Sequence, residues 1–416
     1  MPETNILKDV STIDFDDAAS TKLTEKLEEW GLENFGFAPY EWQVRSAAVI
    51  LQRRQDQMVI ARTGDGKSAV FQLLLATGKT LIVISPILGL IGEQVAALGK
   101  MGITAAGVTA ENLHNDKNMW KDIDRGQYTA VFLSPEMLLE PSSYFWHKMA
   151  ANAKNNTFLK NLAAIVVDEA HVIHKWGETG FRKQYKNIGD LRTYLQLVPF
   201  LLLSATLTPT DRGYLHTTLK MMTPTIITQR SIRRANVRLV CARARAPAGK
   251  WFDLDFLVPE NLAEWETVPK TMIFVDNRNA AQCIANYLRA RFSAEFTVKD
   301  RVQYITVYTA ALGIEIRNVI MANFRAGKTR VLVCTDAAGM GMDIPDVHVV
   351  VQYRISTFKG TLTISDLYQR LGRCARDQRI RGLSIVFVEE KFILPATFDE
   401  SEDANPRFNY YKMSYE

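Results

Sequence analysis

One string near residue 65 has the residue types and spacing of a phosphate-binding loop. The apolar run 58–61 is followed by Thr63-Gly64-Asp65-Gly66-Lys67-Ser68, which predicts a strand, a tight turn and the start of a helix. Glycines in such a turn let backbone N–H groups close around phosphate oxygens. Lys67 can then reach the β- and γ-phosphates, and the Ser68 hydroxyl can bind Mg²⁺. We therefore predict that a nucleoside triphosphate with Mg²⁺ is bound by Thr63, Gly64, Asp65, Gly66, Lys67 and Ser68.

A second string, IVVDEAH (165–171), has two adjacent carboxylates at the end of another apolar run. A carboxylate at a strand end can hold Mg²⁺, which assigns Asp168 to the metal together with Ser68. Its neighbour, Glu169, can orient the water molecule that attacks the terminal phosphate. Either string alone can arise by chance. The two in this order, each after its own strand, predict ATP hydrolysis rather than binding alone.

Two strings farther along can complete such a hydrolysis site. In LLLSATLTP (201–209), Ser204 and Thr206 lie at a strand end, where small hydroxyl groups can sense the acidic pair. In YQRLGRCARD (368–377), a single helix is expected to carry Gln369, Arg373 and Arg376. Arginines three residues apart share a helix face, so both can reach a triphosphate bound on another lobe, as arginine fingers do. The alternative for these two arginines is a solvated helix face.

The strands and helices that position these motifs can also be predicted from the sequence. From about residue 20 to 228, apolar strand-like runs alternate with helical stretches, which is the pattern of a parallel sheet covered by helices on both faces. An arginine-rich segment, 230–245, marks a linker, and the alternation is repeated over 229–390. We therefore predict an α/β protein with two lobes, flanked by an acid-rich N-terminal tail, 1–19, and a C-terminal tail, 391–416.

Composition excludes several classes of protein. The chain has 416 residues, 47% of them hydrophobic, and a net charge of only +5, so a nucleic-acid-binding surface would have to be local. The four cysteines form no CxxC pair, so neither zinc nor a disulfide framework is expected, and the thiols should be reduced in an intracellular protein. No signal peptide is visible, and the longest apolar stretch, around 81–91, is too short to span a membrane.

The order and spacing of these strings resemble those of a known family. Superfamily 2 helicases, and among them the RecQ-like DNA helicases, have strings similar to SPILGLIGEQV (85–95), DEAHVIHKWGETGFRKQY (168–185), IFVDNRNAAQCIANYL (273–288) and TDAAGMGMDIPDV (335–347). The resemblance covers roughly residues 30–390. It implies two tandem RecA-like domains, with ATP and Mg²⁺ between them, and 3′-to-5′ movement on single-stranded or partly duplex DNA. A monomer in the nucleus or nucleoid, acting in DNA repair and recombination, is expected.

The most specific part of the resemblance is the WG…FR segment that follows the acidic pair. Trp176, Phe181 and Arg182 lie close together there. Because aromatic rings stacked on bases contribute about 1–3 kcal/mol each, we predict that these residues bind DNA. The alternative for the two aromatic residues is a place in the core. The residues expected to couple DNA binding to ATP hydrolysis are His171, Ser204 and Thr206.

Several positions depart from the family pattern. Asp65 adds a negative charge to the phosphate loop and should weaken triphosphate binding unless its side chain turns to solvent. Gln43, in FGFAPYEWQ (35–43), is the expected reader of the adenine edge, although this segment resembles that of DEAD-box RNA helicases about as well. Cys374 and Ala375 stand where Ala-Gly is usual, a change that should be sterically mild.

The zinc and winged-helix modules that often follow the second lobe in RecQ-like enzymes have no counterpart after Lys391. The strand-separating wedge that these modules offer is therefore expected to be missing. Two alternatives to a DNA helicase stay open. One is an RNA helicase, against which the WG…FR segment argues. The other is a nucleotide-switched DNA-binding ATPase that does not unwind, which the missing wedge favours.

Overall fold

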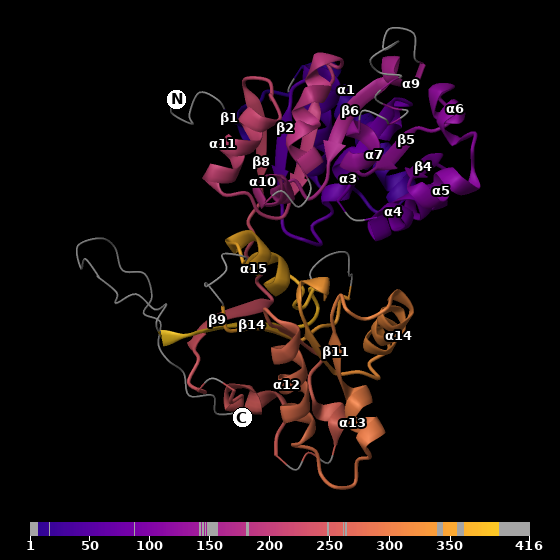
Figure 1. Cartoon of the computed structure of the whole chain (residues 1–416). Helices are drawn as coiled ribbons and strands as arrows, with labels where there is room; N and C mark the ends of the chain where they lie inside the picture. The colour runs from indigo at the N-terminus through magenta and orange to yellow at the C-terminus, as the bar shows by residue number, and fades with distance from the viewer. Residues whose placement is uncertain are drawn as a thin grey trace, which may run out of the picture.

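The computed structural model describes residues 7–15, 17–86, 88–140, 143, 145, 147, 157–179, 183–247, 249–260, 262, 264–338, 344–355 and 362–390. Within these ranges the chain forms two lobes, each with a sheet and helices packed against it (Figure 1). Every pairing between named strands of the described residues is parallel. The predicted fold class, two α/β lobes with parallel sheets, is confirmed.

The N-terminal lobe has an eight-stranded sheet within the described residues, in the order β1-β8-β2-β7-β6-β3-β5-β4. Its strands are β1 (Leu7–Asp9), β2 (Gln57–Ile60), β3 (Thr80–Ile84), β4 (Ala105–Val108), β5 (Ala130–Leu133), β6 (Leu162–Val167), β7 (Phe200–Ser204) and β8 (Thr225–Gln229). Its helices are α1 (Ala18–Phe35), α2 (Glu41–Ala48), α3 (Lys67–Leu74), α4 (Leu88–Lys100), α5 (Ala110–Asn115), α6 (Met119–Asp124), α7 (Pro135–Leu139), α9 (Thr157–Lys160), α10 (His171–Thr179) and α11 (Pro209–Thr218).

The C-terminal lobe has six strands in its described part, in the order β11-β12-β10-β13-β14-β9. They are β9 (Val237–Arg243), β10 (Thr271–Phe274), β11 (Ile305–Tyr308), β12 (Val331–Cys334), β13 (Val349–Tyr353) and β14 (Gly382–Val388). The helices are α12 (Arg278–Arg289), α13 (Val298–Tyr304), α14 (Ile314–Arg325) and α15 (Ile364–Leu371). Further helical segments in the described residues are Val10–Thr12, Val49–Arg53, Leu75–Thr77, Lys183–Thr193, Phe252–Leu257, Trp265–Thr267 and Asp336–Ala338.

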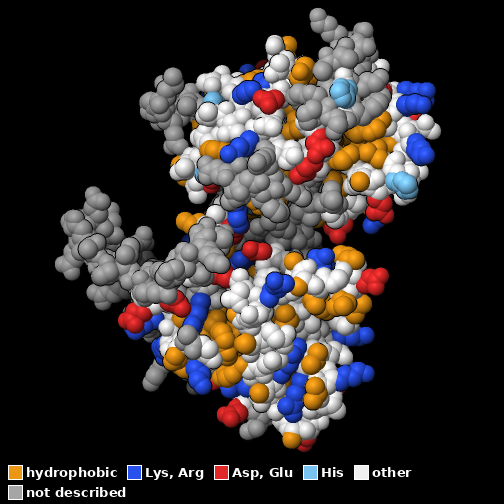
Figure 2. All heavy atoms as spheres, viewed as in Figure 1, with side chains coloured by type: hydrophobic (Ala, Val, Ile, Leu, Met, Phe, Trp, Pro, Cys, Tyr) orange, Lys and Arg blue, Asp and Glu red, His pale blue; other side chains and the backbone are white. Residues whose placement is uncertain are grey.

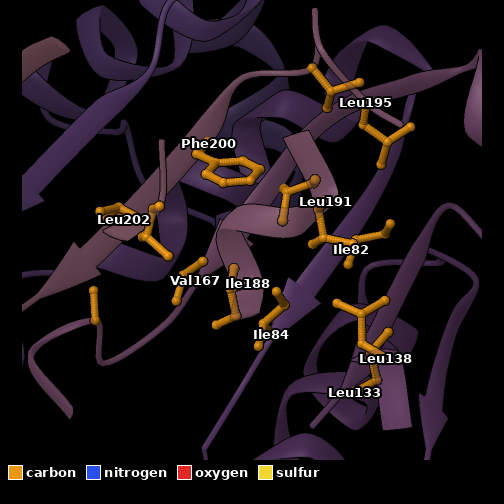
Figure 3. Close-up of a cluster of buried hydrophobic side chains, with 14 of the residues drawn as sticks. Ile82, Ile84, Leu133, Leu138, Val167, Ile188, Leu191, Leu195, Phe200 and Leu202 are labelled. Carbon is orange, nitrogen blue, oxygen red and sulfur yellow. The ribbon is translucent and has the colours of Figure 1, made fainter. Parts of the chain in front are cut away.

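The N-terminal sheet is buried on both faces because alternate residues of its strands enter different cores. On β3, Ile82 and Ile84 pack into one cluster, whereas Leu81 and Val83 pack into another. Successive side chains of a strand point to opposite faces, so a covered parallel sheet is built from continuous apolar runs. Figure 3 shows the first cluster, where side chains of β7 and of segment 183–193 join those of β3.

Residues 7–15 differ from the prediction of an N-terminal tail. β1 pairs with β8 at the edge of the sheet, and Ile13 and Phe15 are buried in the N-terminal core. Isolated apolar residues in a polar stretch show no period, so the sequence pattern did not indicate that they are buried.

Charged side chains are spread over both lobes in the view of Figure 2, with Lys and Arg interspersed among polar and apolar residues. This distribution agrees with the small net charge of the chain. No helix among the described residues is long and apolar enough to cross a membrane.

Candidate nucleotide-binding site between the two lobes

The predicted phosphate loop lies between β2 and α3. Gly64 and Gly66 have left-handed backbones, with φ of 90° and 77°, which glycine adopts at little cost. The helix begins at Lys67, directly after the Gly66 cap. A Cβ atom at residue 66 would lie 2.7 Å from Nε2 of Gln43, so the turn also needs glycine for space. The loop therefore has the strand–turn–helix context that its sequence predicts.

Gln43, the predicted adenine reader, is buried on α2 and holds the phosphate loop in this structure. Its Nε2 donates to the Gly66 carbonyl at 2.9 Å, and its Oε1 accepts from the Tyr40 N–H at 2.8 Å. Both ends of the amide are therefore engaged by backbone groups. Recognition of adenine by Gln43 stays a prediction, and it would require the amide to exchange these partners.

Lys67 and Ser68 occupy the first turn of α3, and both are half-buried. The Lys67 ammonium donates to the Ala61 carbonyl at 2.8 Å. Burial lowers the pKa of Lys67, and the nearby carboxylates of Glu169 and Asp168 act in the opposite direction. The structure thus brings the lysine of the phosphate loop and the acidic pair together.

Asp65 does not turn to solvent. Its carboxylate forms an ion pair with Arg62 at the start of the same loop, and the side chains are 17% and 24% exposed. Because the cation sits directly beside the carboxylate, the loop presents less negative charge to a triphosphate than an isolated Asp65 would. Arg62 also donates to the Arg233 carbonyl at 3.0 Å, in the segment between the lobes.

Asp168 and Glu169 lie at the carboxyl end of β6. The Asp168 N–H donates to the Ile84 carbonyl at 2.9 Å, which fixes its main chain to the end of β3. Burial and the charge of Glu169 raise the pKa of Asp168 well above its usual value, and Lys67 offsets this only in part. Oε2 of Glu169 is buried without a hydrogen-bond partner among the described atoms. Two half-buried carboxylates side by side fit a divalent cation, which Asp168 and Ser68 would hold.

His171 connects the acidic pair to the Ser204–Thr206 string. Its Nδ1 lies 3.1 Å from the Ser204 Oγ and 3.4 Å from Oε2 of Glu169. The Ser204 hydroxyl also donates to the Thr206 carbonyl at 2.9 Å. Burial lowers the pKa of His171, which favours the neutral ring. The predicted coupling residues thus form one connected group beside the acidic pair, and Thr206 takes part through its backbone.

The arginines predicted to share one helix do not do so. α15 ends at Leu371, and Arg373 and Arg376 lie in the turn that follows, while Gln369 is buried on the helix itself. Gly372 is the C-cap of α15, and beyond it Ala375 has a left-handed backbone, with φ of 41°. The prediction of one continuous helix is wrong because a spacing of three residues fits a tight turn as well as a helix.

The change at Cys374 and Ala375 is less mild than the size of these side chains indicates. Ala375 is buried and has a left-handed conformation, which costs a non-glycine residue about 1–2 kcal/mol. A Cβ atom at Gly382 would lie 2.4 Å from Sγ of Cys374, so Cys374 requires a glycine on the neighbouring strand. Having alanine rather than glycine at residue 375 costs backbone conformational energy, which the size of the side chain does not indicate.

Arg370, which sequence reasoning did not single out, is a buried arginine of α15. Its guanidinium donates to Asp336 and, at 2.5 Å, to the Gln352 side chain, and it lies over the Phe274 ring. These contacts attach α15 to the C-terminal sheet. Arg370 therefore holds α15 against the sheet.

The arginine turn faces the phosphate loop across the space between the lobes. The charge of Arg376 contributes to lowering the pKa of both Lys67 and Arg234, which places its guanidinium near the loop. Arg234 donates to the Thr63 carbonyl at 2.6 Å and to the Cys374 carbonyl at 2.7 Å. Sequence reasoning assigned Arg234 only to a linker, because no spacing rule connects a side chain to backbone carbonyls so far along the chain.

A second contact joins the lobes next to the predicted DNA-binding segment. Lys175 on α10 donates to the Asp366 carboxylate on α15 at 2.7 Å, and the side chains are 27% and 9% exposed. Asp366 also accepts from the Thr363 N–H at 2.8 Å, which caps α15. This ion pair thus joins α10, which carries Trp176, to α15, which precedes Arg373.

Trp176 lies on α10 rather than in a loop. Its half-buried ring meets Tyr185 edge to face, with 5.5 Å between ring centres, and packs against the core of the N-terminal lobe. The packing alternative is therefore partly realised, and DNA binding by this ring stays a prediction. Phe181 and Arg182 lie outside the described residues.

The fold, the phosphate loop, the acidic pair and the arginine turn are those of a two-lobe nucleotide hydrolase. Comparison with known families is in agreement. The DEAD/DEAH box helicase domain matches residues 40–212, and the helicase conserved C-terminal domain matches residues 254–378. The chain therefore belongs to the DEAD/DEAH-box helicases, and its similarity to RecQ-family members extends over most of its length.

Three relatives illustrate this similarity. The bifunctional 3′-5′ exonuclease/ATP-dependent helicase WRN of Mus musculus is 28% identical over 91% of this chain and 25% of that protein. The ATP-dependent DNA helicase Q-like 2 of Arabidopsis thaliana is 28% identical over 82% of this chain and 46% of its own length. The putative ATP-dependent RNA helicase R290 of Acanthamoeba polyphaga mimivirus is 28% identical over 94% of this chain and 65% of its own length. The chain thus spans less than two thirds of each.

Solved structures show the same fold. The DEAD-box helicase Mss116 bound to ssRNA and UDP-BeF superimposes with a TM-score of 0.65 at 18% identity, covering 92% of this chain and 77% of that one. Dbp5 of S. cerevisiae bound to RNA and ADP BeF3 superimposes with a TM-score of 0.61 at 20% identity, covering 88% of this chain and 87% of that one. At these identities the likeness confirms the tandem RecA-like fold and does not indicate which nucleic acid is bound.

Proposed function

We propose that this chain is an ATP-dependent DNA helicase or translocase that moves 3′-to-5′ along single-stranded or partly duplex DNA. The observation that carries the proposal is the convergence of groups from both lobes on one place. The phosphate loop and acidic pair come from the N-terminal lobe and the arginine turn from the C-terminal lobe, and Arg234 contacts both. Closing and opening of the lobes in each ATP cycle would then move the bound strand.

Within this site the roles follow from chemistry and position. Lys67 would bind the terminal phosphates, while N–H groups of the loop surround the phosphate chain. Asp168 and Ser68 would hold Mg²⁺, which supplies positive charge to the phosphate oxygens. Glu169 would orient the attacking water, because its buried Oε2 has no hydrogen-bond partner among the described atoms.

The C-terminal lobe would supply the charge that the transition state needs. Arg373 and Arg376 would stabilise the negative charge that spreads over the phosphate oxygens during transfer. Gln369, buried on α15 ahead of this turn, would help to hold it in place. Because these groups come from the opposite lobe, hydrolysis would require the lobes to be closed.

The preference for DNA is supported by the relatives and by the WG…FR segment. Several relatives are named DNA helicases, and WRN is named an ATP-dependent helicase with 3′-5′ exonuclease activity. The polarity of movement and a role in repair and recombination rest on the RecQ resemblance. On the same basis we propose a monomer in the nucleus or nucleoid. Because the four cysteines form no CxxC pair, we also propose that it needs no zinc.

An RNA helicase is the second candidate, because one relative is named a putative RNA helicase. A DNA-binding ATPase without unwinding is the third, because the same site would hydrolyse ATP whether or not strands separate. These candidates differ in what stimulates hydrolysis and in whether strands separate. The experiment must therefore measure both.

Strand separation should be measured on matched duplexes with a 3′ or a 5′ single-stranded tail, alongside ATP hydrolysis with DNA or RNA single strands. We expect separation of the 3′-tailed DNA duplex and stronger stimulation by DNA, with Lys67→Ala inactive in both assays. Equal or stronger stimulation by RNA would favour the RNA helicase. DNA-stimulated hydrolysis without separation of either duplex would favour the ATPase that does not unwind.

A further inference from the structure

We propose that Arg234, in the segment between the lobes, is a positioning residue that joins the phosphate loop to the arginine turn. One arm of its guanidinium donates to the Thr63 carbonyl at 2.6 Å, and the other donates to the Cys374 carbonyl at 2.7 Å. Thr63 is the first residue of the phosphate loop, and Cys374 lies between the two finger arginines. A single side chain therefore contacts both halves of the proposed hydrolysis site.

The geometry of this contact requires arginine. A guanidinium presents several N–H donors in a rigid planar fork, whereas a lysine ammonium is a compact charge that cannot reproduce that fork. Charge-assisted hydrogen bonds to carbonyl oxygens are also stronger than neutral ones. Because both acceptors are backbone atoms, the contact fixes the main chain of the loop and of the turn, whatever side chains they carry.

The neighbouring residues attach the linker to the arginine turn. Nδ2 of Asn236 donates to the carbonyls of Ala375 and Ile380, both at 2.9 Å, and the Gly382 N–H donates to the Asn236 carbonyl at 2.8 Å. Asn236 therefore fixes the linker to the C-terminal lobe alone. Arg234, two residues earlier, reaches back to the N-terminal lobe, so the linker acts as a short strut between the turn and the loop.

Electrostatics make this strut sensitive to the nucleotide. Burial and the charges of Arg376 and Arg62 lower the pKa of Arg234 to about 10, so it stays charged at neutral pH. The positive charges of Arg234, Arg376 and Arg62 repel one another, and the negative charge of a triphosphate in the loop would offset that repulsion. The closed arrangement of loop, linker and turn should therefore be favoured when ATP is bound.

This inference rests on the proposed ATP hydrolysis, and its consequence is specific. Without the Arg234 fork the phosphate loop can still bind nucleotide, because Lys67 and the loop glycines are unchanged. The turn that carries Arg373 and Arg376 would no longer be fixed relative to the loop. Substitution should therefore lower the maximal rate and leave nucleotide affinity nearly unchanged, which a loss of general stability would not do.

The test compares Arg234→Lys with Arg233→Lys, a matched change at an adjacent exposed side chain. Measured quantities are kcat and KM for ATP with single-stranded DNA, the Kd of a fluorescent non-hydrolysable ATP analogue with and without DNA, and the melting temperature. We expect Arg234→Lys to lower kcat at least tenfold per folded molecule and to change KM, and the Kd in the absence of DNA, by less than threefold. In this variant, DNA should no longer increase the affinity of the protein for the analogue. Arg233→Lys should match the wild type.

A kcat of Arg234→Lys within twofold of the wild type would overturn the inference. So would a fall in kcat that only follows the folded fraction, or equal tightening of the analogue by DNA in both proteins. Failure of the proposed function has a different signature, because a wild-type protein that does not hydrolyse ATP would fail before any variant is compared. In that case the analogue measurement still decides whether Arg234 joins the two sites.

Discussion

The two lobes hold their contributions to the proposed hydrolysis site in different ways. In the N-terminal lobe, Asp168 directly follows β6 and Lys67 opens α3, so the sheet and its adjoining turn place them. In the C-terminal lobe, Arg373 and Arg376 stand on an irregular turn beyond the end of α15. That turn is held from outside by Arg234 and its neighbours in the linker.

This difference indicates a division of labour. A group at the end of a buried strand keeps its position for as long as the sheet is folded. A group on a turn that is held by linker hydrogen bonds can shift without unfolding the lobe, because local openings cost less than global unfolding. We therefore expect the N-terminal lobe to determine nucleotide binding and the C-terminal turn to determine the rate once both lobes are closed.

The largest effect is expected for Lys67→Ala, which should abolish ATP turnover with the protein still folded. The change removes the ammonium whose pKa is raised by the charges of Asp168 and Glu169 against the effect of burial. Nucleotide affinity and DNA-stimulated hydrolysis should both be measured, with Lys220→Ala as the control at an exposed lysine of the same lobe. Turnover within tenfold of the wild type would show that the loop lysine does not have this role.

Arg376→Ala should lower the rate of ATP hydrolysis by about 10³–10⁵, the range for arginine fingers, with a much smaller effect on nucleotide affinity. Its guanidinium belongs to the lobe opposite the phosphate loop, so it should act on the transition state. Single-turnover hydrolysis measures this directly. Arg379→Ala is the matched control, because that side chain is 88% exposed and pairs with Asp377. An equal loss of affinity and rate would contradict the division between the lobes.

Trp176→Ala should weaken single-stranded DNA binding by about 1–3 kcal/mol, the value of one stacked base. Trp120→Ala is the matched control, because that ring is also partly buried against the core of the N-terminal lobe. Binding of a fluorescent DNA strand and thermal melting should be measured for both variants. Similar losses of stability, with DNA binding reduced only for Trp176→Ala, would support stacking. Unchanged DNA affinity would assign Trp176 to packing alone.

The smallest effect is expected for Lys175→Met. It should lower DNA-stimulated hydrolysis by about fivefold, or about 1 kcal/mol, because a charge-assisted hydrogen bond between the lobes is lost and solvent screens part of it. The control, Lys220→Met, removes an ion pair with Asp190 of similar length, 2.8 Å, that lies within one lobe and is about half exposed. Asp366→Asn keeps an acceptor for the α15 cap and should reproduce the effect. A loss of the same size in Lys220→Met would assign it to general stability.

The sequence predicts the N-terminal half of this site well because its signals are local. The phosphate loop and the acidic pair each follow a buried apolar strand, and the structure places both as that pattern requires. The end of α15 at Leu371 was not predictable from arginine spacing, because a spacing of three residues fits the turn that follows as well as a helix. Arg234 was also missed, since its two acceptors are backbone carbonyls on different lobes. Contacts of that kind leave no pattern in the sequence around the side chain.

The central claim is that hydrolysis requires both lobes to close and that a bound strand completes the closure. The most direct measurement is the steady-state rate of ATP hydrolysis by the full chain, with and without single-stranded DNA at saturating ATP. The account predicts a low rate without DNA and a rate at least tenfold higher with it, because the arginine turn and the phosphate loop lie on opposite lobes. Equal rates with and without DNA would contradict it.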